Sequence, residues 1–238
     1  TALVTGSSRG LGSAIAMELA NQGSTVLLHA SKETQASRES LTAVKAISPA
    51  SRIYYADVSD PIKVQEMAKA IRHDHKQIDI LVNNAGITKS STIASMTDEQ
   101  WNSVIQTNLS GVFFVTRALA AYMNKNARFV NMSSVYGIIG EYGIANYSAS
   151  KAGVIGLTRA LAKELGPKRI TVNAVCPGLT DAGMIHSIPP KQLALRLSHI
   201  PLGRIGTKEE VAKLVAFLCS SDAGYITGQT ISINGGMA

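Results

Sequence analysis

A tyrosine and a lysine stand four residues apart, at Tyr147 and Lys151, in the stretch IANYSASKAGVIGL. Positions i and i+4 of a helix share one face, so a helix here places the two side chains next to each other. The pKa of a free tyrosine is about 10, and a nearby cation favours the phenolate and lowers that value. The pair therefore indicates a phenol that transfers its proton near neutral pH, with a functionless surface pair as the alternative.

Two more polar residues can complete a proton-transfer site. Ser134 ends the strand-like run FVNMSS, where a hydroxyl can hold a substrate carbonyl oxygen. Asn108 lies in TNLSG within a long helix-like segment, and its side chain can hold a water that completes a proton path. Together with the tyrosine and the lysine, these residues predict an enzyme that acts on a carbonyl group.

A glycine-rich loop, TGSSRGLG, follows the first strand-like run and opens a helix-like segment. Its glycines, Gly6, Gly10 and Gly12, have the spacing G-x-x-x-G-x-G rather than G-x-G-x-x-G. Glycines let the backbone turn tightly and approach a pyrophosphate, which then lies at the N-terminus of the helix. Alone, the loop also suits a simple turn, but at the first strand–helix junction of an α/β pattern it predicts dinucleotide binding.

The end of the second strand-like run indicates which nicotinamide cofactor fits. An NAD site usually has an Asp or Glu about 20 residues further along, which binds the ribose 2′-hydroxyl. Here the run ends in LLHASK, with His29 and Ser31 in that region and no carboxylate before Glu33. Arg9 and Lys32 are nearby cations that suit a 2′-phosphate. The sequence therefore favours NADP, the alternative being that both cations are solvated surface residues.

Two motifs at later strand ends extend the predicted cofactor site. Asp57 in ADVSD is placed to accept the adenine amino group, while Ser59 or Asp60 also suits a helix N-cap. The glycine of NNAG, residues 83–86, permits close approach of the backbone to the cofactor. Asn83 in the same motif can instead satisfy neighbouring backbone groups.

Short apolar runs alternate with helix-length segments along the chain. The strand-like runs include ALVTG, STVLLHA, IDILVNNAG and RITVNAVCPG, and the helix-like segments include 32–47, 97–123 and 208–220. The runs are nearly continuous in apolar residues, as expected for strands covered by helices on both faces. This alternation predicts an α/β fold with a doubly wound parallel sheet, in one domain over residues 1–238.

Residues 181–206 interrupt the alternation. They contain three prolines and a short amphipathic piece, PKQLALRL, between a strand end and the next helix. Doubly wound folds bind their ligands at that edge of the sheet. We therefore predict a mobile lid over the site. The alternative is an insertion that only packs against the rest of the protein and has no function.

The formal net charge of +7 and the pI of about 9.5 favour an acidic partner, such as a charged cofactor or a small acidic carrier protein. The 23 Lys and Arg residues form no block of like charge, so we expect no nucleic-acid arm. We also expect no membrane span, because no run approaches about 18 apolar residues.

Two cysteines, Cys176 and Cys219, lie far apart in the sequence. Their spacing argues against a disulfide framework or a zinc site, so we expect no metal and two buried thiols. This cysteine pattern fits a protein of a reducing compartment. The prediction is the cytoplasm, with the matrix of a mitochondrion or plastid as the alternative if a targeting segment has been removed.

Over essentially its whole length the chain resembles the short-chain dehydrogenases/reductases of the Tyr-x-x-x-Lys type. The matching motifs are TGSSRGLG, DV at 57–58, NNAG, Asn108, Ser134, YSASK and PG at 177–178. The resemblance implies a Ser–Tyr–Lys–Asn tetrad, a Rossmann fold of about seven strands and a homotetramer. It also implies that Pro177, Gly178 and the backbone after them contact the nicotinamide. The family often has a Thr four positions beyond this Gly, where this chain has Ala182, and Thr180 is the nearest substitute.

Within that family, the C-terminal third is most similar to bacterial-type 3-oxoacyl-[acyl-carrier-protein] reductases, in the stretch IPLGRIGTKEEVAKLVAFLCSSDAGYITGQTISINGGMA. This similarity implies reduction of a 3-oxoacyl thioester by NADPH, with acyl-carrier protein as partner. Lys125 and Lys168 fall where those enzymes carry basic residues that dock the carrier. Reduction of another ketone or oxidation of an alcohol (sugar, polyol, steroid, xenobiotic carbonyl) and a non-catalytic NADP-binding sensor remain alternatives.

The residues expected to contact the cofactor, from the motifs and the resemblance together, are Gly6, Ser8, Arg9, Gly10, Leu11, Gly12, His29, Ser31, Lys32, Asp57, Val58, Asn84, Ala85, Gly86, Tyr147, Lys151, Pro177, Gly178 and Thr180.

Overall fold

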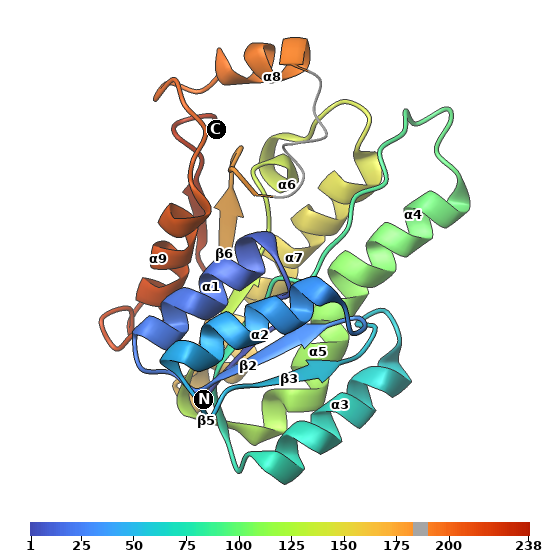
Figure 1. Ribbon diagram of the computed structural model, residues 1–238. Coiled ribbons are helices and arrows are strands. Elements are labelled where there is room, and N and C mark those ends of the chain that lie inside the picture. The colour runs from blue at the N-terminus through green and yellow to red at the C-terminus, as the bar shows by residue number, and fades with distance from the viewer. Residues whose placement is uncertain (183–189) are drawn as a thin grey trace.

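The computed structural model describes residues 1–182 and 190–238, and of residues 190–192 the backbone alone. Its centre is one parallel sheet of seven strands in the order β3-β2-β1-β4-β5-β6-β7, which confirms the predicted doubly wound α/β fold (Figure 1). The strands are β1 (Ala2–Val4), β2 (Val26–Ala30), β3 (Arg52–Tyr55), β4 (Ile78–Asn83), β5 (Met123–Met132), β6 (Thr171–Pro177) and β7 (Thr230–Ile233). The order reverses between β1 and β4, so ligands of such a fold bind at the carboxyl ends of these strands.

Helices cover both faces of the sheet (Figure 1). One face carries α1 (Gly10–Asn21), α2 (Gln35–Ile47) and α9 (Lys208–Cys219), and the other carries α3 (Pro61–Asp74), α4 (Asp98–Ile105), α5 (Gly111–Leu119) and α7 (Ala145–Leu165). Within β1, Leu3 packs in the layer of α3, whereas Ala2 and Val4 pack in the layer of α1. Every residue of β1, β2 and β6 is buried, so both faces of these strands are covered, which explains their continuous apolar runs. The edge strands β3 and β7 are partly exposed. Cys176 and Cys219 are buried free thiols, as predicted.

The helix expected over 97–123 is one helical run of four pieces. It consists of α4, a π-helical turn (Gln106–Ser110), α5 and a 3-10 turn (Ala120–Tyr122). Thr97 and Gln100 cap its start, each side chain accepting from the backbone N–H of the other residue. By length and composition alone, Asp98–Tyr122 is apolar enough to cross a membrane, which the sequence reading overlooked. Val112, Val115 and Leu119 are buried against the sheet, as in a core helix of a globular protein.

Two short helices stand at the carboxyl edge of the sheet, α6 (Tyr136–Ile139) and α8 (Pro190–Leu197) (Figure 1). The predicted lid, 181–206, lies partly outside the described residues, because 183–189 are not among them. In its described part, Leu193 and Leu197 pack against Leu179 and Ile200. Mobility of the lid stays a prediction.

Candidate active site

Ser134, Tyr147 and Lys151 come together at the carboxyl end of β5. Ser134 lies two residues beyond the strand, and the other two lie on one face of the first turns of α7. Lys151 Nζ donates a hydrogen bond of 2.7 Å to the Met132 carbonyl, and Ser133 Oγ donates one of 2.8 Å to the Lys151 carbonyl. Each of the three predicted residues is at most 7% exposed. The structure thus joins the serine, the tyrosine and the lysine in one buried site.

Burial dominates the pKa of Tyr147. Loss of hydration raises this pKa above its usual value, and the adjacent Ser134 hydroxyl lowers it in part. We expected Lys151 to lower it, but the ammonium donates to the Met132 carbonyl and lies 5.7 Å from the centre of the Tyr147 ring. That expectation is therefore wrong for the cofactor-free protein. The phenol keeps its proton at neutral pH, as a proton donor must.

Lys151 lies between the candidate catalytic residues and the NNAG motif that is expected to contact the cofactor. Burial lowers the pKa of its ammonium to about 8. Among the described residues, Met132 alone accepts a hydrogen bond from Nζ, so two N–H groups are available to a ligand. A Cβ atom placed at Gly86 would lie 3.7 Å from Nζ, and the lysine therefore borders the backbone of the NNAG motif.

Asn108 clamps the chain next to Gly86. Its Nδ2 donates to the Ile87 carbonyl (2.9 Å) and to Ser150 Oγ (3.2 Å), and its Oδ1 accepts from the Ile87 N–H (2.8 Å). We expected the side chain to hold a water, but both of its N–H groups are already donated to protein atoms. Ser150, which the sequence analysis missed, also donates to the Tyr147 carbonyl. Only its place in YSASK, three residues after the tyrosine, was available as a signal.

The glycine loop is folded tightly against the end of β4. Gly6 has a φ of +65°, and a Cβ there would lie 2.8 Å from the Cα of Ala85. Asn84 Nδ2 donates to the carbonyls of Thr5 (3.0 Å) and Gly6 (3.1 Å), and a side chain at Gly12 would overlap both that amide and the Gly6 carbonyl. Non-glycine residues therefore cannot replace these two glycines without displacing the loop.

The start of α1 suits a phosphate group. Arg9 occupies the N-cap without a side-chain cap, and no acidic residue lies in the first turn. Gly10 has a φ of +57° and open space where a Cβ would stand. Ser8 and Leu11 complete this half-buried turn. Free N–H groups and the positive end of the helix dipole favour an anion, so the loop fits the pyrophosphate of a dinucleotide.

His29 lies beneath the glycine loop rather than on the surface. It is 2% exposed, and its Nδ1 accepts from the Gly6 N–H (3.1 Å) while Nε2 contacts the Ala56 carbonyl (2.9 Å). Because a backbone N–H can only donate, Nδ1 is the acceptor and Nε2 carries the proton. Burial lowers the pKa of His29 to about 4, so the ring is neutral. We expected His29 to touch the cofactor, but the structure gives it the supporting position.

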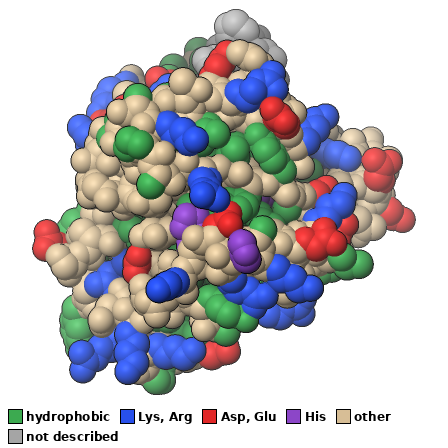
Figure 2. All heavy atoms as spheres, turned by 60° about the horizontal axis from the view of Figure 1, so that its bottom comes forward, with side chains coloured by type: hydrophobic (Ala, Val, Ile, Leu, Met, Phe, Trp, Pro, Cys, Tyr) green, Lys and Arg blue, Asp and Glu red, His purple; other side chains and the backbone are tan. Residues whose placement is uncertain are grey.

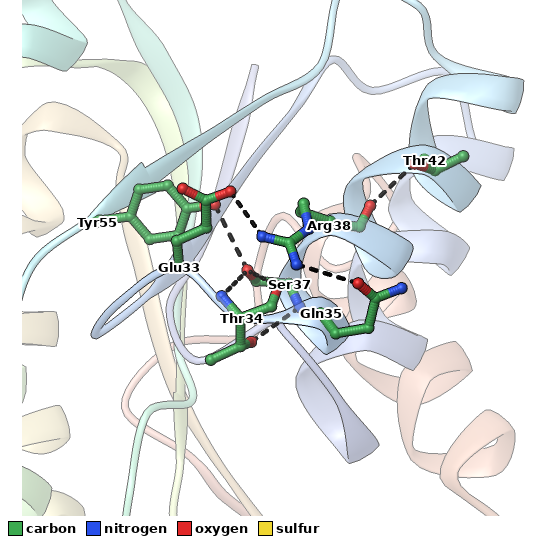
Figure 3. A network of polar contacts seen from close by, with 7 residues as sticks. All are labelled: Glu33, Thr34, Gln35, Ser37, Arg38, Thr42 and Tyr55. Atoms are coloured by element: carbon green, nitrogen blue, oxygen red, sulfur yellow. Dashed lines mark hydrogen bonds and ion pairs between the residues drawn. The ribbon is translucent and has the colours of Figure 1, made fainter.

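The first carboxylate after β2 is already paired. Glu33 forms a 3.0 Å ion pair with Arg38, within the polar network that starts α2 (Figure 3). Thr34 caps this helix and accepts from the Ser37 N–H, so the helix begins three residues later than the expected 32–47. Ser31 and Lys32 are exposed beside this network.

Other predicted cofactor residues lie at the same edge of the sheet. The exposed Asp57 carboxylate accepts from Ser59 N–H and Oγ, which lowers its pKa, and Val58 packs on Gly111. Of the two predicted N-cap candidates, Asp60 rather than Ser59 caps α3. Asn83 has a structural role, but its amide donates to the buried side chains of Thr116 and Asn131 rather than to the backbone groups expected above.

Pro177, Gly178 and Thr180 follow the end of β6. The Pro177 carbonyl accepts from the Val135 N–H at 2.9 Å, which ties β6 to the serine turn. Gly178 abuts Asn234, and Thr180 pairs with Gly206. These residues therefore lie beside the catalytic site, but the pairing of Thr180 leaves its predicted contact with the nicotinamide a prediction.

Lys125 and Lys168 do not lie near this site. Lys125 is the third residue of β5, and Lys168 ends a 3-10 turn (Gly166–Lys168) three residues before the first residue of β6. Both are exposed at the amino edge of the sheet, whereas Ser134 and Tyr147 lie at the carboxyl edge. Figure 2, which brings the amino edge forward, shows several groups of Lys and Arg side chains on this face. No group of His, Cys, Asp or Glu in the described part of the chain could hold a metal ion.

Comparison with known proteins gives full-length matches. The profile of a family described as enoyl-(acyl carrier protein) reductase matches residues 6–238. The chain is 42% identical to 3-oxoacyl-[acyl-carrier-protein] reductase FabG of Escherichia coli K12, over 99% of this chain and 96% of that protein. Proteins of the same name from Thermotoga maritima (43%; 99% and 96% covered) and Staphylococcus aureus Mu50 (41%; 100% and 97% covered) are similarly close.

Proposed function

Since the chain belongs to the short-chain dehydrogenase/reductase family, we propose that it is an NADPH-dependent 3-oxoacyl-[acyl-carrier-protein] reductase of fatty acid synthesis. It reduces the 3-oxo group of an acyl thioester to the 3-hydroxy form. The observation that carries this proposal is the buried site in which Ser134, Tyr147 and Lys151 meet beside the glycine loop. The names of the full-length relatives support the substrate class.

Each residue of the site has a chemical task in the proposed reaction. When bound, NADPH supplies the hydride for the ketone carbon. Ser134 donates a hydrogen bond to the ketone oxygen, and the protonated phenol of Tyr147 gives its proton to that oxygen. Lys151 uses its two free N–H groups to hold the ribose of the cofactor, and Asn108 fixes the backbone at Ile87. General acid catalysis of this kind contributes about 10²–10⁴-fold to the rate.

The preference for NADP rests on the surface at the end of β2. Arg9 and Lys32 are exposed cations on the two loops that flank the site of the adenine ribose. Glu33, the first carboxylate there, is neutralised by Arg38 and does not stand free to repel a phosphate. His29 supports the glycine loop from below. We expect kcat/KM with NADPH to exceed that with NADH at least tenfold; equal values would contradict the assignment.

The carrier protein and the assembly belong to the same proposal. Lys125 and Lys168 stand at the opposite edge of the sheet from Tyr147, so a carrier docked on them serves the site of a neighbouring subunit. This requires self-association, for which we propose a homotetramer. Exposed aromatic side chains on α4 and α5, Trp101 and Phe113, supply an apolar surface for it. We place the enzyme in the cytoplasm, where its two thiols stay reduced.

One assay tests the function. NADPH oxidation is followed with acetoacetyl-carrier protein, a panel of simple ketones and a 2-enoyl thioester, the last because of the description of the matching family. We expect the highest kcat/KM with the carrier-linked 3-oxo substrate. A better simple ketone would move the assignment to another carbonyl substrate, and a better enoyl thioester would move it to carbon–carbon double bonds. No turnover of any substrate would favour the NADP-binding sensor.

A further inference from the structure

A second tyrosine stands beside the catalytic one. Tyr136 follows Ser134 by two residues, and its backbone N–H donates to Ser134 Oγ at 3.2 Å. The next residue, Gly137, packs directly on the backbone and Cβ of Lys151, so this turn is pressed against α7. Ser134 lies between the two tyrosines, because its hydroxyl accepts from the Tyr136 N–H and is also a neighbour of the Tyr147 phenol.

The Tyr136 hydroxyl is buried but unused. It has no hydrogen-bond partner among the residues that the structure describes. A buried hydroxyl without a partner loses free energy, so such groups in native proteins commonly meet a ligand or a water. The residues recorded around Tyr136 are the catalytic serine, Ser134, and Arg196 of α8.

The ring of Tyr136 is held in place by a cation from α8. The Arg196 guanidinium lies over the ring, 5.8 Å from its centre, and its Nε is 3.7 Å from Glu141 Oε2. Both members of this ion pair are 25% exposed, so they are shielded from bulk water in part. Arg196 therefore joins α8 to the turn that carries Tyr136, and restricts where the phenol can point.

We propose that Tyr136 is a specificity-determining residue whose hydroxyl donates a hydrogen bond to the thioester carbonyl of the substrate, with Arg196 as the positioning residue for its ring. A 3-oxoacyl thioester has two carbonyl oxygens separated by one methylene. Ser134 and Tyr147 bind the reacting one, and Tyr136 lies next to them with a free donor. This assignment deepens and rests on the proposed function, since it concerns recognition of the 1,3-dicarbonyl group.

The test compares two substrates and two variants. Substrate one is an acetoacetyl thioester, and substrate two is its thioether analogue, in which a methylene replaces the thioester carbonyl. Tyr136→Phe should lower kcat/KM for the thioester about 3- to 10-fold, with a clearly smaller loss for the thioether. If the thioether is reduced too slowly for its rate to be measured, its Ki as a competitive inhibitor of the wild type and of Tyr136→Phe gives the same comparison. Tyr142→Phe, which alters an 82% exposed tyrosine of the same segment, is the matched control without effect.

A second pair of variants tests the positioning role. Arg196→Met should lower kcat/KM for the thioester by a similar factor, and adding it to Tyr136→Phe should change nothing further. Further loss in the double variant would mean that Arg196 contacts the ligand directly, and would overturn its positioning role. Equal losses on both substrates, or none, would overturn the role of Tyr136. Failure of the unaltered enzyme to reduce the thioester would refute the proposed function itself, and this inference with it.

Discussion

Replacement of Gly12 by alanine probes how tightly the cofactor loop is built. A Cβ at Gly12 would lie 2.9 Å from the Gly6 carbonyl carbon and nearer still to its oxygen and to Asn84 Nδ2. Neither neighbour can move alone, because Asn84 Nδ2 bonds the carbonyls of Thr5 and Gly6. The methyl group must therefore push the loop and β4 apart.

The size of the effect follows from those contacts. Overpacking of a buried site destabilises by about 1–3 kcal/mol, and each weakened hydrogen bond adds about 1 kcal/mol. The better helix propensity of alanine offsets about 1 kcal/mol of this destabilisation. We expect Gly12→Ala to lose about 2–4 kcal/mol of unfolding free energy and to weaken NADPH binding at least tenfold, since the displaced N–H groups are those proposed to face the phosphates.

Gly156→Ala provides the matched control. Gly156 is also inside a helix, α7, but it is exposed, and within the described part of the chain no atom beyond its own stretch of helix lies within 4 Å of a Cβ placed there. This variant should gain about 0.5–1 kcal/mol from helix propensity and bind NADPH normally. Urea unfolding, titration of NADPH fluorescence and size-exclusion chromatography of both variants make the comparison. A Gly12→Ala protein with the stability and NADPH affinity of the wild type would refute the close packing on which the cofactor site is built.

Four further outcomes are expected. Tyr147→Phe should keep its NADPH affinity within about twofold while kcat falls about 10²–10⁴-fold, and wild-type turnover would contradict its role as acid. The pKa of Lys151 is lowered to about 8 in the folded protein, so the wild type gains stability as the pH rises from about 8 toward 10; Lys151→Met should lack that rise in urea unfolding of the cofactor-free enzyme. His29, with its pKa lowered to about 4, takes up a proton more readily when unfolded, so stability falls as the pH drops from about 6.5 to 4; His29→Gln should flatten this part of the curve. Glu in place of Lys125 and Lys168 should lower kcat/KM at low salt for carrier-linked substrate more than for a free thioester, and equal losses would remove the docking proposal.

The predicted fold agrees with the structure where the hydrophobic pattern of a few consecutive residues matches the way the strands pack between the helix layers. Continuous apolar runs identified the inner strands because helices cover both of their faces, as at Leu3 in β1. The Tyr147–Lys151 pairing followed from helical spacing alone, and the glycine loop from backbone sterics at Gly6 and Gly12. These features depend on a few consecutive residues.

Other features depend on which groups meet across the fold. The raised pKa of Tyr147 comes from burial by distant segments, and the protonation of His29 from the Gly6 N–H that points at its ring. The Asn108 amide forms two hydrogen bonds with the backbone of Ile87, and no spacing rule predicts them. Desolvation and hydrogen bonding sum over many neighbours, so their sign is set only once the chain is packed.

The sequence by itself determined the chemistry: a parallel α/β sheet, a dinucleotide loop, and a serine, a tyrosine and a lysine able to act on a carbonyl. Only the tertiary structure decided where the charges and donors stand. It put Lys125 and Lys168 at the edge of the sheet opposite the site, and brought Arg196 over the ring of Tyr136. Residue types and short spacings encode reactivity, but the distance between segments far apart in sequence is set by how the helices pack on the sheet.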